Sequence, residues 1–310
     1  MGTITRIIIT IFILLSGSLS PVSILHANQK SKVAVFYPEV REPYKTIYQE
    51  ILQGVKTSAG TEVIENVLPK EFDVSEITQK LEVQGIKKVI VLGRAGYQLA
   101  KKLPADITVV SGALPIHPNG ISGISLISDP GSLFYYLKQV APEVARIHVA
   151  YSQRNEWLIE LAKQAAIEHK LELNAKQVES TGDAIAFYNQ LFDSDISNVD
   201  AIWLPLDKVS SHDKVTLPLI LEKAWSKEVP VFSSKPSHAK RGALFSTYPD
   251  NVALGSRLAI MVNELADQST QEKFAALKSL QLAVNLRTAA HLGLKYSDEQ
   301  LDTFKVTFPE

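Results

Sequence analysis

The side chains that most often carry chemistry are few in this sequence and stand far apart. None of the 310 residues is a cysteine, which excludes disulfides, zinc–thiolate and iron–sulfur sites, and thiol catalysis. No two of the histidines beyond residue 26 have the helical spacing of metal ligands. We expect His148, within an apolar strand, and His169 and His291, near helix ends, to be structural. His212 and His238 fall in loops without a carboxylate cluster, so we expect them to be solvated.

Motifs of the common enzyme classes are missing as well. The sequence has no phosphate-binding Gly-rich loop, no Gly-x-Gly-x-x-Gly after the first strand and no Gly-x-Ser-x-Gly elbow. A formal net charge of -1 argues against a nucleic-acid binder. We therefore expect a protein that is not an enzyme and that uses no cofactor or metal. One enzymatic alternative stays open, a secreted hydrolase whose unrecognised carboxylate pair includes Asp207.

Basic and aromatic side chains gather instead in loops that follow strands. The basic ones are Arg94, Arg154, Lys208 and Lys235, and the aromatic ones are Tyr37, Tyr151 and Tyr248. Guanidinium and ammonium groups form strong hydrogen bonds with carboxylate oxygens. Any of these basic side chains that pointed into a ligand-binding cleft would therefore favour an anionic ligand. The tyrosine rings would add a flat apolar wall. The alternative is that the basic side chains simply extend into water.

The elements that must position these residues are strands and helices in alternation. The predicted strands are Val33–Phe36, Thr61–Val67, Lys87–Leu92, Ile107–Ser111, Ile121–Ile127, Arg146–Tyr151, Glu172–Val178, Ala201–Leu206, Val229–Ser233, Ala243–Ser246 and Gln281–Asn285. Such alternation predicts mostly parallel sheets with helices on both faces. Because so many strands are too many for one open sheet, we expect an α/β protein with two doubly wound, Rossmann-like lobes. No Pro-, Gly- and Ser-rich tether separates the halves, so strand-like crossings should form a multi-strand hinge.

Residues 1–27 have the pattern of a cleavable secretory signal peptide. Arg6 precedes the apolar run Ile7–Leu15, and small and turn-forming residues lead on to Ala27. The run is shorter than the ~20 residues that span a bilayer. An uncleaved anchor is the competing interpretation. Since there is no cysteine to carry a lipid, we expect an exported, unlipidated protein of the periplasm.

Four segments resemble one group of ABC-transporter substrate-binding proteins, which have the type I periplasmic-binding fold and include aromatic amino acid binders. The segments are Asn119–Ser125, Asp200–Asp207, Arg241–Gly255 and Leu282–Leu294. The third contains the group's Gly-Ala-Leu strand, its turn with Asp and its Leu-Gly helix. The fourth contains Asn-x-x-Thr-Ala and Leu-Gly-Leu. The resemblance covers the mature chain in element order, but its specific wording is confined to these segments.

The sequence also departs from that group at positions that concern the ligand. Leu206-Asp207-Lys208 stands where the group often has Thr-Asp-Asn, and Lys235 lies near the position of a Glu. Arg94 adds a positive charge to a loop where small and apolar residues are common. The resemblance therefore does not carry over the identity of the ligand.

The resemblance implies a cleft onto which both lobes direct the carboxyl ends of their strands. The ligand-contact residues expected on this basis are Tyr37, Glu39, Arg94, Ser111, Gly112, Ser152, Asn155, Asp207, Lys208, Ser234, Lys235 and Asp250. We expect one lobe to comprise residues 30–126 and 247–279, and the other residues 127–246 and 280–310.

The implied function is capture of a small metabolite, such as an amino acid or another carboxylate or anion, by hinge closure. The implied partner is the membrane permease of an ABC importer, and we expect a monomer that binds no nucleic acid. The alternative is a ligand-sensing periplasmic module that signals to a membrane kinase or cyclase.

Overall fold

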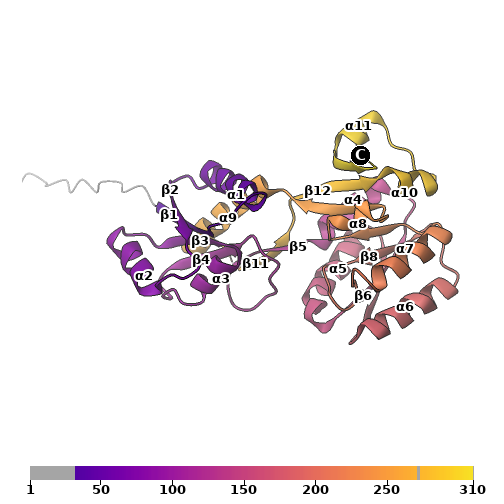
Figure 1. Ribbon diagram of the computed structural model, residues 1–310, viewed down its shortest axis with the longest axis horizontal. Coiled ribbons are helices and arrows are strands. Elements are labelled where there is room, and N and C mark those ends of the chain that lie inside the picture. Colours follow the sequence, from indigo (N-terminus) through magenta and orange to yellow (C-terminus); the bar gives the residue numbers. More distant parts are fainter. Residues whose placement is uncertain (1–31, 271–272, 310) are drawn as a thin grey trace, which may run out of the picture. The chain divides into compact units, whose positions relative to one another are not determined.

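A computed structural model describes residues 32–270 and 273–309. The predicted signal peptide, residues 1–27, lies outside the described residues. The described chain forms two sheets, each flanked by helices (Figure 1). This is the predicted α/β class with two parallel-sheet lobes.

The first sheet has six strands, all paired in parallel, in the order β11-β5-β4-β3-β1-β2. Its strands are β1 (Lys32–Pro38), β2 (Glu62–Leu68), β3 (Lys88–Leu92), β4 (Thr108–Gly112), β5 (Gly123–Ser128) and β11 (Phe274–Leu277). Its helices are α1 (Tyr44–Ser58), α2 (Val74–Val83), α3 (Gly93–Ala100) and α9 (Asn251–Ala266). Alternation along β1 divides the core, because Val33 and Val35 pack with α1 and α9 whereas Ala34 and Phe36 pack with α2 and α3.

The second sheet has seven strands in the order β13-β12-β10-β9-β8-β6-β7. They are β6 (Arg146–Tyr151), β7 (Glu172–Gln177), β8 (Asp200–Leu204), β9 (Val231–Ser233), β10 (Phe245–Pro249), β12 (Leu280–Asn285) and β13 (Phe304–Phe308). Only the pair of β10 with β12 is antiparallel among these described strands. The helices are α4 (Pro130–Val140), α5 (Glu156–Glu168), α6 (Thr181–Asp193), α7 (Thr216–Ser226), α8 (Ser237–Lys240), α10 (Leu286–His291) and α11 (Asp298–Asp302), with a 3₁₀ turn η1 (Gln153–Asn155).

The chain passes between the two sheets three times. It leaves the first sheet after β5, returns to it after β10 and leaves again between β11 and β12. Hydrogen bonds join all three passages: the Ser128 and Thr247 hydroxyls lie 3.1 Å apart, the Asp129 N–H donates to the Leu277 carbonyl at 2.8 Å, and the Asp250 N–H donates to the Ser279 carbonyl at 3.0 Å. These passages form the predicted multi-strand hinge. The exact lobe boundaries stay a prediction.

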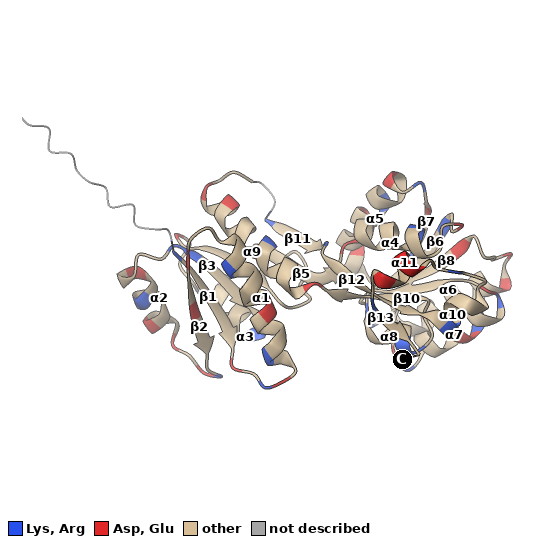
Figure 2. Cartoon of the chain, turned by 90° about the horizontal axis from the view of Figure 1, so that it is seen from above, with Lys and Arg blue, Asp and Glu red and all other residues tan. Residues whose placement is uncertain are grey.

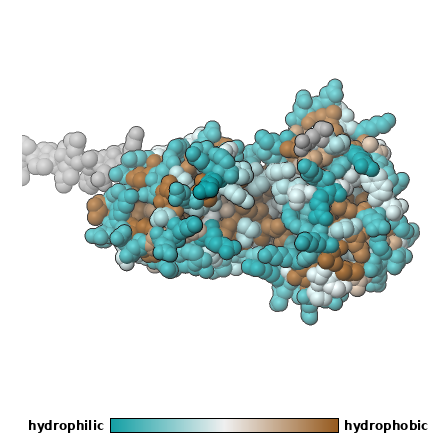
Figure 3. Space-filling view, in the orientation of Figure 1, coloured by the Kyte–Doolittle hydropathy of each residue, from teal (hydrophilic) through white to brown (hydrophobic). Residues whose placement is uncertain are grey.

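Every predicted strand is present, and two short strands were not predicted, β11 and β13. Both lie at a sheet edge, where a strand needs no continuous apolar run because one side is unpaired. Within residues 32–270 and 273–309, no helix is both long and apolar enough to cross a bilayer. Basic and acidic residues are interspersed along the helices and strands (Figure 2), and hydrophilic residues cover much of the face shown in Figure 3.

Candidate ligand-binding site

Asp207 ties together two loops at the carboxyl edge of the second sheet. Its carboxylate, 6% exposed, accepts the Ser152 N–H at 2.8 Å, the Ser152 hydroxyl at 2.7 Å and the Asn155 amide at 2.8 Å on one oxygen. The other oxygen accepts the Val209 and Ser210 N–H groups at 2.8 and 3.2 Å. Burial raises the pKa of Asp207, but these hydrogen bonds outweigh it and lower the pKa overall. The group is an anion whose oxygens hold the β6–η1 and β8–α7 loops.

Asn155 extends this arrangement to His117. It lies at the N-cap position of α5, but its side chain makes no cap hydrogen bond. The amide nitrogen donates to Asp207, so the amide oxygen faces His117 Nε2, 3.2 Å away. His117 Nε2 therefore carries a proton, and Nδ1 is a hydrogen-bond acceptor when the ring is neutral. Burial, assisted by the charge of Arg154, lowers the pKa of His117.

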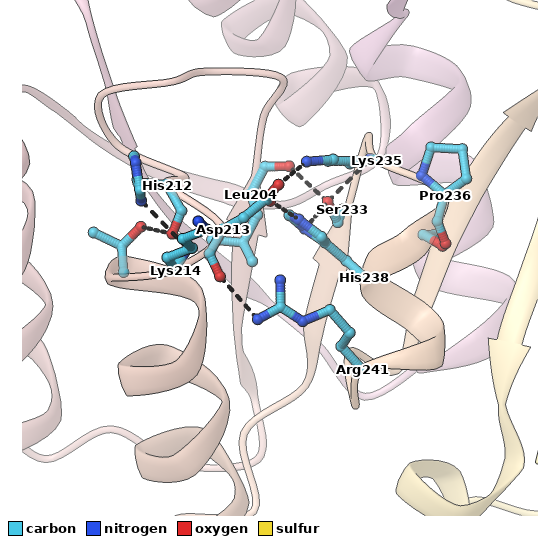
Figure 4. Close-up of polar contacts among 11 residues, drawn as sticks. Leu204, His212, Asp213, Lys214, Ser233, Lys235, Pro236, His238 and Arg241 are labelled. Carbon is cyan, nitrogen blue, oxygen red and sulfur yellow. Dashed lines mark hydrogen bonds and ion pairs between the residues drawn. The ribbon is translucent and has the colours of Figure 1, made fainter.

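A second network surrounds His238, and here the sequence-based prediction was wrong. His238 is 1% exposed rather than solvated, because its ring lies between two other side chains (Figure 4). Nε2 is 2.9 Å from a carboxylate oxygen of Asp213, and Nδ1 is 2.8 Å from the Ser233 hydroxyl. Asp213 also pairs with the Lys235 ammonium, and its backbone carbonyl accepts a hydrogen bond from Arg241 at 2.8 Å. His212, the other loop histidine, is half-buried, and its Nδ1 accepts the Lys214 N–H at 3.3 Å.

The Ser233–His238–Asp213 order of contacts resembles a hydrolase triad, but its geometry indicates a structural role. A nucleophile must reach its substrate, whereas Ser233 is fully buried. Its hydroxyl accepts the Lys235 N–H at 3.0 Å and also lies 3.2 Å from the Leu204 carbonyl. Burial raises the pKa of Asp213, but hydrogen bonds from Lys235 and His238 lower it to about 2. The network thus neutralises the charge of Lys235 at the end of β9.

The predicted contact residues of the first lobe lie at the carboxyl ends of β1, β3 and β4. Tyr37 stacks on Tyr48 with ring centres 6.1 Å apart, and its hydroxyl donates to Glu65 at 3.3 Å. Glu39 is exposed in the loop after β1, and Arg94 is exposed in the first turn of α3.

Two neighbours at the end of β4 face different surroundings. Ser111 is fully buried. A Cβ at Gly112 would lie 2.6 Å from Leu258 Cδ1, so this glycine allows close packing of α9. Gly112 therefore has a packing role against α9, and its contact with a ligand stays a prediction.

The remaining predicted contacts are dispersed. Ser234 is buried, and its hydroxyl accepts a hydrogen bond from the Trp203 ring nitrogen at 3.4 Å. Lys208 is exposed. Asp250 caps α9 by accepting the Ala253 N–H at 2.9 Å.

Several buried polar atoms near the strand ends have no hydrogen-bond partner among the described residues. Within the described part of the chain there are six such side-chain atoms. One belongs to Thr61, before β2. The other five follow the carboxyl ends of strands or lie close to them: Ser111 Oγ, His117 Nδ1, Trp157 Nε1, Ser210 Oγ and Ser211 Oγ. Because buried polar groups are normally satisfied, this concentration indicates a place where a ligand or water completes the structure. The Ser210-Ser211 pair next to Asp207 is a signal that sequence reasoning missed.

A hollow of about 470 Å³ opens beside α3. The residues that line it are Arg94, Tyr97, Gln98, Lys101, Leu114, Pro115, Ile116, His117, Asn119 and Arg154. The hollow thus brings together two of the four predicted basic residues, Arg94 and Arg154, with Lys101, which was not predicted. Lys208 and Lys235 are not in its lining.

A family model described as ABC transporter substrate binding protein matches residues 117–305. The chain belongs to this family. Its structure is similar to the ligand-free, open structure of a substrate binding protein with adhesive properties from Clostridium difficile. The two share 15% identity and a TM-score of 0.58, over 89% of this chain and 98% of that one. An ABC domain in complex with L-Trp from Streptococcus pneumonia matches with 18% identity and a TM-score of 0.48 over 89% of this chain and 100% of that one. No curated protein matches the sequence. The fold is that of the type I periplasmic binding proteins.

Proposed function

We propose that this substrate-binding protein captures a small solute between its two lobes and delivers it to the permease of an ABC importer. The observation that carries the proposal is the group of unpartnered buried polar atoms near strand ends, in a chain of a substrate-binding family. In open α/β sheets the carboxyl ends of the strands are where ligands bind. A solute that forms hydrogen bonds with these atoms would bind more tightly than one that leaves them without a partner.

The solute class that the site favours is an amino acid or another carboxylate or anion. The hydroxyls of Ser111, Ser210 and Ser211 are buried and have no hydrogen-bond partner among the described residues, so they could donate to its oxygens once their loops rearrange on hinge closure. The Lys235 ammonium offsets the charge of Asp213, whereas Asp207 stays an anion whose oxygens are held by neutral donors. All the predicted ligand contacts stay part of the proposal: Tyr37, Glu39, Arg94, Ser111, Gly112, Ser152, Asn155, Asp207, Lys208, Ser234, Lys235 and Asp250.

The proposed compartment is the periplasm, reached through a signal peptide cleaved after Ala27. Without a cysteine the protein cannot carry the N-terminal lipid of a bacterial lipoprotein. It would then diffuse as a monomer between solute and permease.

Native mass spectrometry of the protein purified from its own periplasm tests the proposal directly. We expect a retained small molecule, and adding that molecule at 100 times its dissociation constant should stabilise the fold by about 2.7 kcal/mol. Deleting the gene should then abolish high-affinity uptake of the same solute. Binding without any effect on uptake would favour the sensing alternative. A protein that retains nothing and is stabilised by no solute would contradict the proposal.

A further inference from the structure

The four basic residues of the strand-end loops have different surroundings, and these decide which of them can hold a ligand. Lys235 is paired with Asp213, which compensates its charge. Lys208 is exposed and does not line the hollow beside α3. Arg94 and Arg154 do line it, one from the first turn of α3 and the other from η1. These two arginines are therefore the candidates for an anion.

Among the described residues, no carboxylate lines this hollow. Its charged lining residues are Arg94, Lys101 and Arg154, and none of the lining residues is acidic. In the described residues neither arginine has an ion pair, whereas Arg146 and Arg257 are paired with Asp200 and Glu264. Three like charges around one hollow repel one another unless an anion lies between them.

A further feature suits the hollow to an anion. The N-terminus of α3 has no side-chain cap and no acidic residue in its first turn, although α2, α4 and α9 are each capped by an aspartate. Helix N-termini favour negative charge.

We propose that Arg94 and Arg154, assisted by Lys101, form a subsite for an oxyanion group of the solute, a carboxylate or a phosphate. This inference rests on the proposed function and narrows it, because the solute must then carry an anionic group beyond any that the serine hydroxyls bind. A dicarboxylate, an acidic amino acid or a phosphate ester fits this requirement. The planar guanidinium groups favour bidentate hydrogen bonds with such oxygens.

Calorimetric titration with matched pairs of solutes tests the subsite. The probes are L-glutamate against L-glutamine, succinate against succinamide, and inorganic phosphate. We expect an anionic probe to bind and its neutral partner to bind at least tenfold more weakly. Arg94→Gln and Arg154→Gln should each raise the dissociation constant of that anion about 10- to 100-fold, the range for lost charge-assisted hydrogen bonds. Binding by phosphate alone would identify the oxyanion as a phosphate rather than a carboxylate.

The matched control is Lys102→Gln, which removes the same charge one residue beyond Lys101 and outside the hollow. It should change the dissociation constant less than twofold. Both arginines are exposed, so their variants should keep the melting temperature of the unliganded protein. Added salt should weaken anion binding in the wild type more than in the double variant.

Two results would overturn the subsite. One is an anion that binds the double variant as tightly as the wild type. The other is a wild type that binds none of the anions. In either case a neutral solute retained in native mass spectrometry would leave the proposed function intact, whereas the absence of any ligand would count against both.

Discussion

Asp207 shows how one buried side chain can hold two strand-end loops together. Its two oxygens take all five of the donors described above, so the β6–η1 and β8–α7 loops share one anchor. A carboxylate in this position accepts only, while an amide would place an NH₂ group against those donors. The hydrolase alternative required Asp207 as a catalytic acid or base, but the oxygens of this carboxylate are engaged in structural hydrogen bonds.

Asp207→Asn should therefore destabilise the protein by about 2–4 kcal/mol, since it weakens charge-assisted hydrogen bonds and leaves buried donors unsatisfied. Denaturant unfolding followed by circular dichroism measures this. Asp195→Asn removes the same charge from an exposed loop position of the same lobe and should change stability by less than about 0.5 kcal/mol. Equal stability of the two variants would refute the anchoring role.

His238 gives the protein a dependence on pH whose sign follows from its burial. Burial lowers the pKa of His238 below its usual value, and Asp213 only partly opposes the shift. As pH falls through about 6.5, the unfolded chain takes up a proton that the folded ring resists. The stability present above that pH is then progressively lost toward the lower folded-state pKa, and His117 contributes with the same sign.

We expect the free energy of unfolding to decline between pH 7 and pH 5, by at most about 1.4 kcal/mol per pH unit for each proton. His238→Gln should be less stable at pH 7 but should show a shallower decline, and adding His117→Gln should flatten it further. Urea unfolding at a series of pH values gives these slopes. A slope unchanged in both variants would show that other groups govern the decline.

At the scale of elements, α1 and α9 approach so closely that only glycine fits where they cross. A Cβ at Gly54 would lie 1.9 Å from the Val252 carbonyl oxygen, and one at Gly255 would lie 1.9 Å from that of Ile51. The Ser256 hydroxyl reaches across to the Gly54 carbonyl at 3.2 Å. The Leu-Gly of the family resemblance is thus explained by backbone-to-backbone packing.

Gly255→Ala should force these helices apart and cost about 1–3 kcal/mol or more, as overpacking does. Differential scanning calorimetry should show a lower melting temperature. Gly182→Ala is the control, because a Cβ there meets only the Ser180 hydroxyl at 3.5 Å within α6, where alanine is the better helix former. If both variants melted like the wild type, the two helices would not be in the contact described.

Prediction from sequence succeeded for elements and was weaker for the site. Runs such as Lys88–Leu92 identify buried strands because their apolar pattern is local. The environment of His238 is not local, since Asp213 lies 25 residues away and only the adjacency of β8 and β9 brings the two together. The pairing of Lys235 could not be predicted for the same reason, although its position after a strand could.

At the scale of the whole molecule, the charge is balanced overall and uneven locally. The formal net charge is -1, yet the hollow beside α3 has three basic residues and no acidic one. A local positive field of this kind draws anions toward one place without making the whole surface adhere to polyanions. This arrangement would suit the proposed capture and release of an anionic solute.

The route of the chain has a consequence for how the protein comes into being. Because α9 covers α1 and β11 completes the sheet begun by β1, the earliest-made half lacks its partners until the last quarter has been synthesised. A nascent chain that stops at residue 244 has an uncovered α1, lacks one edge strand of the first sheet and lacks both the second and the third passage. The first lobe can therefore complete its fold only after α9 and β11 have been synthesised. Most of the chain is made before either lobe has all of its elements.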